Sequence, residues 1–185
     1  MIANPIVPKK VFLTKGLGRD QDKLIAFEYA LRSARIQQFN LVPVSSIIPP
    51  NCEVVSIDDG LKELKEGQIL FCVLSKKESS VLNQNVSASI SMALPKDPNK
   101  YGYVAENGFD CESEEIADRC VEKLALVLLA TKLGIEVDRT MPHAELKKQF
   151  LNNELVKDLK SASAQGVVEK ENEWTCAISA AVFVY

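Results

Sequence analysis

The chain has 185 residues, 46% hydrophobic and 25% charged, which predicts one folded domain over residues 1–185 rather than a disordered chain. Its net charge of −3 argues against nucleic acid or an anionic membrane as a partner. Residues 1–5 show no apolar signal segment, and no apolar run is long enough to span a membrane, so we expect a cytoplasmic protein.

The N-terminal part of the chain predicts a helix and an edge strand. Asp20 is a candidate N-cap, and the spacing of apolar residues behind it predicts a helix over 20–36. The buried face of this helix is expected to carry Leu24, Phe27, Leu31 and Ala34. Residues 39–44 follow as a strand, and Pro43 removes a backbone donor there, which indicates an edge or bulged position.

Two further strands are predicted next, with a loop behind them. One strand spans residues 52–57, and Asp58 or Asp59 then caps a short helical turn. Residues 69–74 form a continuous apolar run that is typical of a buried strand, and residues 76–84 are expected to form a charged loop.

Residues 86–94 alternate between apolar and small polar side chains, which predicts a strand. Its small face consists of Ser87, Ser89 and Ser91, which either line a site or allow a neighbouring element to pack closely. A strand over 101–106 is expected to end in a turn at Asn107 and Gly108.

The C-terminal half predicts a long helix, a charged segment and a final strand. The helix begins near Ser113 and ends at Gly134. Its buried stripe is expected to consist of Ile116, Cys120, Leu124, Leu128 and Thr131. Residues 140–172 are predicted as a helix followed by a surface loop, and residues 177–185 as an apolar strand.

The sequence has few of the residue patterns that usually mark a catalytic site. The single histidine, His143, has no patterned partner for a catalytic triad or a metal site. The cysteines are odd in number and scattered, which favours free thiols in a reducing compartment over disulfides or a metal site. They are Cys52, Cys72, Cys111, Cys120 and Cys176. We therefore expect an enzyme of this composition to make its reactive group from the chain itself.

The pair Ser45–Ser46 is the best candidate for that group. It lies in the segment 40–50, which reads Asn-Leu-Val-Pro-Val-Ser-Ser-Ile-Ile-Pro-Pro. On composition alone such a pair marks a turn at the end of a strand. The whole segment, however, resembles the cleavage motif of the pyruvoyl-dependent arginine decarboxylase family, Asn-Leu-x-x-[Val/Ile]-Ser-Ser-Ile-x-Pro-Pro. The resemblance continues at residues 88–97 and 101–106 and spans most of the chain.

This resemblance implies self-processing at Ser45–Ser46. The Ser46 hydroxyl attacks the carbonyl of Ser45, an exchange that requires a strained loop or fixed donors for the oxyanion. Elimination and loss of ammonia then leave a covalent pyruvoyl group at residue 46, on an α chain 46–185 beside a β chain 1–45. That group forms a Schiff base with L-arginine and accepts the electrons left by carbon dioxide, so that agmatine is formed without a metal.

Three further roles follow from the resemblance. Asn40 matches an asparagine that positions the reactive groups, and Glu106 matches a glutamate that protonates the intermediate as a general acid. Glu28 falls where the family has an acidic residue, an aspartate, for the substrate guanidinium. Asn40 and Glu106 each have a plainer alternative as side chains at the end of a strand.

The resemblance also implies an αββα sandwich assembled as a trimer of αβ units, with each active site at a subunit interface. Periodicity by itself indicates only a layered α/β domain. Two alternatives stay open: the same chemistry on another amino acid, because Glu28 departs from the aspartate, and a non-catalytic paralogue that acts as an assembly partner.

Overall fold

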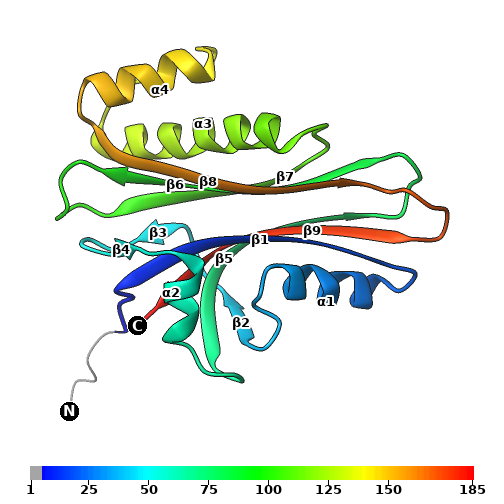
Figure 1. The fold of residues 1–185 in the computed structure, drawn as a ribbon. Coiled ribbons are helices and arrows are strands. Elements are labelled where there is room, and N and C mark those ends of the chain that lie inside the picture. The colour runs from blue at the N-terminus through cyan, green and yellow to red at the C-terminus, as the bar shows by residue number, and fades with distance from the viewer. Residues whose placement is uncertain (1–5) are drawn as a thin grey trace.

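A computed structural model describes residues 6–185, and residues 1–5, where no signal segment is predicted, lie outside the described part. The described chain is a mixed α/β protein that contains two sheets and four helices. Figure 1 shows the two sheets against each other, with α1 and α2 on one side and α3 and α4 on the other. Within residues 6–185 no helix is both long and apolar enough to cross a bilayer.

The first sheet has five strands in the order β2-β5-β9-β1-β4. They are β1 (Lys10–Asp20), β2 (Asn40–Pro43), β4 (Glu53–Val54), β5 (Ile69–Ser79) and β9 (Trp174–Val184). The central strand β9 pairs antiparallel with both β1 and β5. β2 is an edge strand, parallel to β5, which confirms the edge position predicted from Pro43.

The second sheet has four antiparallel strands in the order β3-β7-β6-β8. They are β3 (Ile47–Ile48), β6 (Asn85–Pro95), β7 (Gly102–Phe109) and β8 (Val156–Val167). β3 belongs to this sheet although β2, just before it, belongs to the other sheet. The chain therefore passes from one sheet to the other between Pro43 and Ile47.

The helices are α1 (Lys23–Ser33), α2 (Ile57–Lys62), α3 (Glu114–Leu133) and α4 (His143–Asn152). α3 begins at the N-cap Ser113 and ends at Gly134, whose φ of 71° is the left-handed conformation that glycine favours, so both predicted ends are confirmed. α1 is capped by Asp22 rather than Asp20, because the Asp22 carboxylate accepts from the Leu24 and Ile25 amides. α2 is capped by Ser56 instead of Asp58 or Asp59.

Three apolar layers hold these elements together. Phe12 and Ala30 belong to the layer between α1 and the five-stranded sheet. Val73 and Ile90 represent the layer between the two sheets, where side chains of both inner faces meet. Leu129 belongs to the layer between α3, α4 and the four-stranded sheet. Burial of these three layers is the main favourable term for the fold.

Several predicted strand boundaries are wrong. The strand expected over 52–57 is only Glu53–Val54, and β5 continues to Ser79, into the first part of the expected loop. β7 runs through Asn107 and Gly108 without a turn, because both residues pair with β6. Residues 156–167, expected as surface loop, form the long strand β8, whose charged and serine side chains obscure the alternation.

The predicted buried faces of two helices also need correction. In α1, Leu31 and Ala34 are buried as predicted, but Leu24 is 74% exposed, and Ala26 and Ala30 complete the face against the sheet. In α3, the predicted stripe faces outward, and Leu124 and Leu128 are exposed. The buried residues of α3 are Ala117, Val121, Glu122, Ala125, Leu126, Leu129 and Ala130.

Small side chains explain which face of α3 packs inward. Ser87, Ser89 and Ser91 on β6 are fully buried, and they alternate with Ile90 and Met92, which fill the layer between the sheets. These serines therefore lie on the face of β6 that α3 covers. Ala117, Ala125 and Ala130 lie on the helix face that packs inward, and small residues of this kind allow close approach to a strand. The serine face serves packing and lines no cavity near the described site.

Candidate active site

The Ser45–Ser46 bond lies at the point where the chain crosses between the sheets. On its N-terminal side, the Val44 amide donates to the Cys72 carbonyl of β5, at 2.9 Å. On its C-terminal side, the Ser46 carbonyl accepts from the Val104 amide of β7, also at 2.9 Å. Each flank of the bond is thus fixed to a different sheet, and the two serines form the bridge.

The backbone around Ser46 provides a donor for the carbonyl that would be attacked. The Ile47 amide donates to the Ser45 carbonyl oxygen at 3.0 Å, which closes a three-residue turn centred on Ser46. An amide in this position would stabilise negative charge developing on that oxygen. Neither serine is among the non-glycine residues with positive φ, so the turn offers a fixed donor rather than left-handed strain.

The Ser46 hydroxyl donates to the Glu106 carboxylate, with 3.2 Å between Oγ and Oε2. The two residues are far apart in sequence and meet because β3, directly after Ser46, pairs with β7, which carries Glu106. The sequence assigned both residues to the active site, and the structure places them in contact.

Loss of water around the Glu106 carboxyl raises its pKa above the ordinary value of 4.5, while the hydrogen bond from Ser46 opposes that shift. Although the residue as a whole is exposed in the single chain, its carboxyl end is enclosed enough for this desolvation to prevail. A carboxyl group with a raised pKa stays protonated at higher pH, as a general acid must.

Ser46 and Glu106 open into a cavity of about 460 Å³ between β7 and α3. Its apolar wall comes from the outward-facing stripe of α3, and the cations Lys123 and Arg139 also line it. The full lining is Ser46, Ala105, Glu106, Cys120, Lys123, Leu124, Val127, Leu128 and Arg139. The α3 residues were missed as site residues because their helical spacing was interpreted as a core face.

Asn40 and Glu28 lie apart from the Ser46–Glu106 pair in the single chain. The Asn40 side-chain amide donates to the Gly67 carbonyl at 2.7 Å, which ties the start of β2 to the turn before β5. Glu28 forms an ion pair with Arg32 on α1, with 3.0 Å between Oε1 and Nε. Within residues 6–185, no hydrogen bond or ion pair connects either side chain with Ser46 or Glu106.

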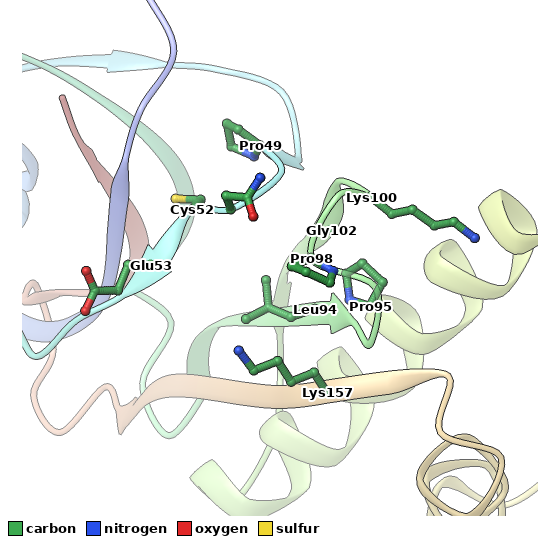
Figure 2. A pocket seen from close by; sticks show the side chains of 10 residues that line it. Pro49, Cys52, Glu53, Leu94, Pro95, Pro98, Lys100, Gly102 and Lys157 are labelled. Carbon is green, nitrogen blue, oxygen red and sulfur yellow. The ribbon is translucent and has the colours of Figure 1, made fainter.

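A second cavity, of about 290 Å³, lies near Pro49 at the other end of the crossover. Figure 2 shows Pro49 and Cys52 on one side of it and Leu94 and Lys157 on the other. Neither Ser46 nor Glu106 lines it. Because the nucleophile and the acid open into the larger cavity, that cavity is the candidate active site.

His143 is part of a separate polar cluster. Its Nε2 lies 2.7 Å from Oε2 of the buried Glu122, which also accepts from Lys147 at 2.9 Å. Ser161 donates to the other carboxylate oxygen at 3.1 Å. The cluster joins α4 to α3 and does not line the candidate active site, so the partners of His143 are structural.

Comparison with known proteins decides the family. A model of the family described as pyruvoyl-dependent arginine decarboxylase matches residues 10–185. The chain belongs to this family. A probable pyruvoyl-dependent arginine decarboxylase of Chloroherpeton thalassium is 43% identical over 180 residues, which cover 96% of this chain and 98% of that protein. Pyruvoyl-dependent arginine decarboxylase 2 of Methanosarcina mazei is 40% identical, covering 97% and 98%.

A third relative matches to a similar extent. The pyruvoyl-dependent arginine decarboxylase of Thermoplasma volcanium is 39% identical over 178 residues, covering 96% of this chain and 97% of that protein. Members of the pyruvoyl-dependent arginine decarboxylase family thus match this chain from end to end. The family implies a covalent pyruvoyl group, and Ser46, with its donor-lined turn and its contact to Glu106, fits the formation of that group.

Proposed function

We propose that this protein is a self-processing, pyruvoyl-dependent arginine decarboxylase that converts L-arginine to agmatine and carbon dioxide. One observation carries the proposal: the Ser46 hydroxyl meets the Glu106 carboxylate where the chain crosses between two sheets. Membership of the family supports the activity and the pyruvoyl group. The roles of individual residues in this activity are proposed below.

Self-cleavage would occur at Ser45–Ser46, giving a β chain 1–45 and an α chain 46–185. The Ser46 Oγ attacks the Ser45 carbonyl carbon, Glu106 accepts the hydroxyl proton through the hydrogen bond it already makes, and the Ile47 amide stabilises the oxyanion. The pieces stay together after the break, because β1 pairs with β9 along its whole length and α1 is packed into the apolar layer beneath it.

The pyruvoyl group at residue 46, once formed, supplies an electron sink for the departing carboxylate. The Ser46 hydroxyl, which donates to Glu106 and lowers its pKa, is then gone. Loss of this donor leaves desolvation as the main influence on Glu106, so processing itself favours the protonated carboxyl. Glu106 can then donate its proton to the substrate carbon from which carbon dioxide has left.

Recognition of arginine is assigned to Glu28 of a neighbouring subunit. Glu28 lies on α1, on the opposite side of the sheets from the α3 wall of the cavity, so one chain does not bring it to its own Ser46 (Figure 1). A trimer of αβ units, each an αββα sandwich, would place α1 of one subunit against the cavity of the next. The exposed residues Leu124 and Leu128 on α3 supply an apolar surface for this contact.

Asn40 has a positioning role in this scheme. Its side chain holds the start of β2 against the turn at Gly67, and β2 leads directly into the Ser45–Ser46 bond. It would thus fix the approach of the cleavage segment without contacting the reacting atoms. The five described cysteines are all free thiols, which suits the cytoplasmic location that we propose.

The proposal is tested by incubating the purified protein with L-arginine and measuring agmatine and carbon dioxide. Ser46→Ala is the matched control, because it removes only the attacking oxygen and should remain uncut and inactive. Activity that favours lysine or ornithine would keep the pyruvoyl chemistry and overturn the arginine assignment. A well-folded, uncut protein that acts on no amino acid would instead indicate a non-catalytic paralogue.

A further inference from the structure

Two cations of the candidate active site have no described partner within the chain. Lys123 lies on α3 and Arg139 lies in the connection between α3 and α4, and both line the cavity that contains Ser46 and Glu106. Lys123 is half-buried and Arg139 is exposed. Several other cations of the chain pair with carboxylates, but within residues 6–185 no hydrogen bond or ion pair involves either of these two side chains.

The acidic residues of this region do not neutralise the two cations. Glu106 forms no described ion pair, and loss of water raises its pKa, whereas a cation beside it would lower that pKa. The lowered pKa of Asp138 comes mainly from its hydrogen bonds with Thr140, at 2.6 and 2.8 Å, and only to a smaller extent from Lys123. Asp138 does not line the cavity, although Arg139 beside it does. The cavity therefore presents two positive charges to a molecule that enters it.

We infer that Lys123 and Arg139 bind the α-carboxylate of the substrate and so distinguish arginine from agmatine. This inference rests on the proposed decarboxylase activity. The amine of the substrate must reach residue 46, and the carboxylate is attached to the same carbon atom as that amine, so it enters the same cavity. Lysine and arginine side chains donate charge-assisted hydrogen bonds to a carboxylate, and the guanidinium of Arg139 can donate two in parallel.

The charge of this wall also determines the direction in which arginine lies. Like charges repel, so the guanidinium of the substrate is directed away from Lys123 and Arg139. It then extends toward the neighbouring subunit, where we propose Glu28 as its partner. The two ends of the substrate thus meet opposite charges, which favours one orientation over the reverse.

Loss of carbon dioxide turns this attraction into repulsion. Near neutral pH arginine has a carboxylate and two cationic groups, whereas agmatine has only the two cationic groups. The pair Lys123 and Arg139 therefore attracts the substrate and repels the product, which promotes release of agmatine. Because the departing carbon dioxide is neutral, the pair interacts more strongly with the bound substrate than with the transition state. It contributes to binding and not to the chemical step.

Kinetics of the processed, assembled protein tests the pair. Replacing both Lys123 and Arg139 with glutamine should raise KM for arginine by roughly tenfold or more, since hydrogen bonds to a charged group are lost, and should not lower kcat. The inhibition constant of agmatine should stay equal or fall, because the repulsion is removed. Lys123→Arg keeps the charge and should stay within a few-fold of wild type. Arg119→Gln is the matched control on α3, because Arg119 pairs with Glu115 and does not line the cavity.

Calorimetry measures the same preference without turnover. Ser46→Ala, which should remain uncut, is titrated with L-arginine and with agmatine, and its preference for arginine should disappear when both cations are also replaced. An unchanged KM, or equal weakening of arginine and agmatine, refutes the assignment. Variants that no longer assemble on gel filtration refute it in favour of a contact between subunits. A wild type that forms no agmatine refutes the proposed function, and the calorimetry then decides the role of the pair by itself.

Discussion

Replacing Glu28 with glutamine tests both the arginine assignment and the site between subunits. In the single chain Glu28 pairs with Arg32, and the two side chains are 40% and 61% exposed. A helical pair as exposed as this contributes about 0.3–0.5 kcal/mol. A guanidinium enclosed against a carboxylate at an interface loses about 2–5 kcal/mol when its partner is removed. If Glu28 binds the substrate as proposed, the guanidinium of arginine would displace Arg32 from it.

From these magnitudes, Glu28→Gln should lower kcat/KM for arginine by roughly 30-fold or more. Self-cleavage should be unaffected, because no described hydrogen bond or ion pair connects Glu28 with Ser46. Arg32→Gln is the matched control on the same helix face and should keep kcat/KM within a few-fold. The assay is agmatine formation at several arginine concentrations, with cleavage followed by gel electrophoresis.

Coexpression of Glu28→Gln with Ser46→Ala shows whether the two residues act from different subunits. In a closed ring of head-to-tail interfaces with random mixing, about one site in four combines an intact residue 46 with an intact Glu28 from its neighbour. Activity should thus recover to roughly a quarter of the wild-type value, although each variant alone is nearly inactive. No recovery in verified mixed oligomers, or an unchanged kcat/KM in Glu28→Gln, would refute the reasoning.

Further changes test other parts of the account. Glu106→Gln should lower decarboxylation by roughly 10²–10⁴-fold at matched pyruvoyl content, whereas rates within a few-fold of wild type would remove Glu106 from the mechanism. In the wild type, activity should decrease as the pH rises through the pKa of Glu106, which is raised above the ordinary 4.5, because the acid then loses its proton. The pH profile of Glu106→Gln should lack this decrease. Ser46→Cys should still cleave, because a thiol makes the same acyl shift, and gel electrophoresis of the purified variant shows whether it does. Gly16→Ala should lower the melting temperature clearly, because its Cβ would lie 2.1 Å from the Ala30 carbonyl oxygen, and a melting temperature equal to that of wild type would contradict this.

Local chemistry was sufficient to predict some elements from the sequence. α3 has its predicted cap at Ser113 and its predicted end at Gly134, because a side-chain acceptor and a left-handed glycine act within a few residues. β6 follows its alternating pattern because each of its faces meets a different layer, which leaves a period of two in the sequence. The proline of β2 correctly indicated an edge strand.

Elements that depend on distant neighbours were not predictable in this way. β8 is a long strand because it pairs with β6, yet Lys160 and Ser161 interrupt its apolar pattern, and Ser161 and Ser163 bond to acids of α3. The orientation of α3 is set by the small residues beneath it, which helical spacing does not reveal.

For the candidate site too, some residues could be predicted from the sequence and others could not. The cleavage pair and Glu106 were found through resemblance to a family, since nothing in the spacing between residues 46 and 106 indicates that they meet. Pairing of β3 with β7 is what brings them together. Glu28 lies on the opposite side of the sheets from the cavity of its own chain, so its place in the site depends on the neighbouring subunit that we propose. The α3 wall was overlooked because exposed leucines at helical spacing have the same pattern as a core face.

The central claim is that Ser46 becomes the catalytic group when the chain cuts itself after Ser45. Intact mass spectrometry of the freshly purified, active protein tests this most directly. We expect two polypeptides, residues 1–45 and residues 46–185, with the larger one lacking a free N-terminal amine, and a single uncut chain for Ser46→Ala. A fully active preparation that consists of the uncut chain would contradict the account.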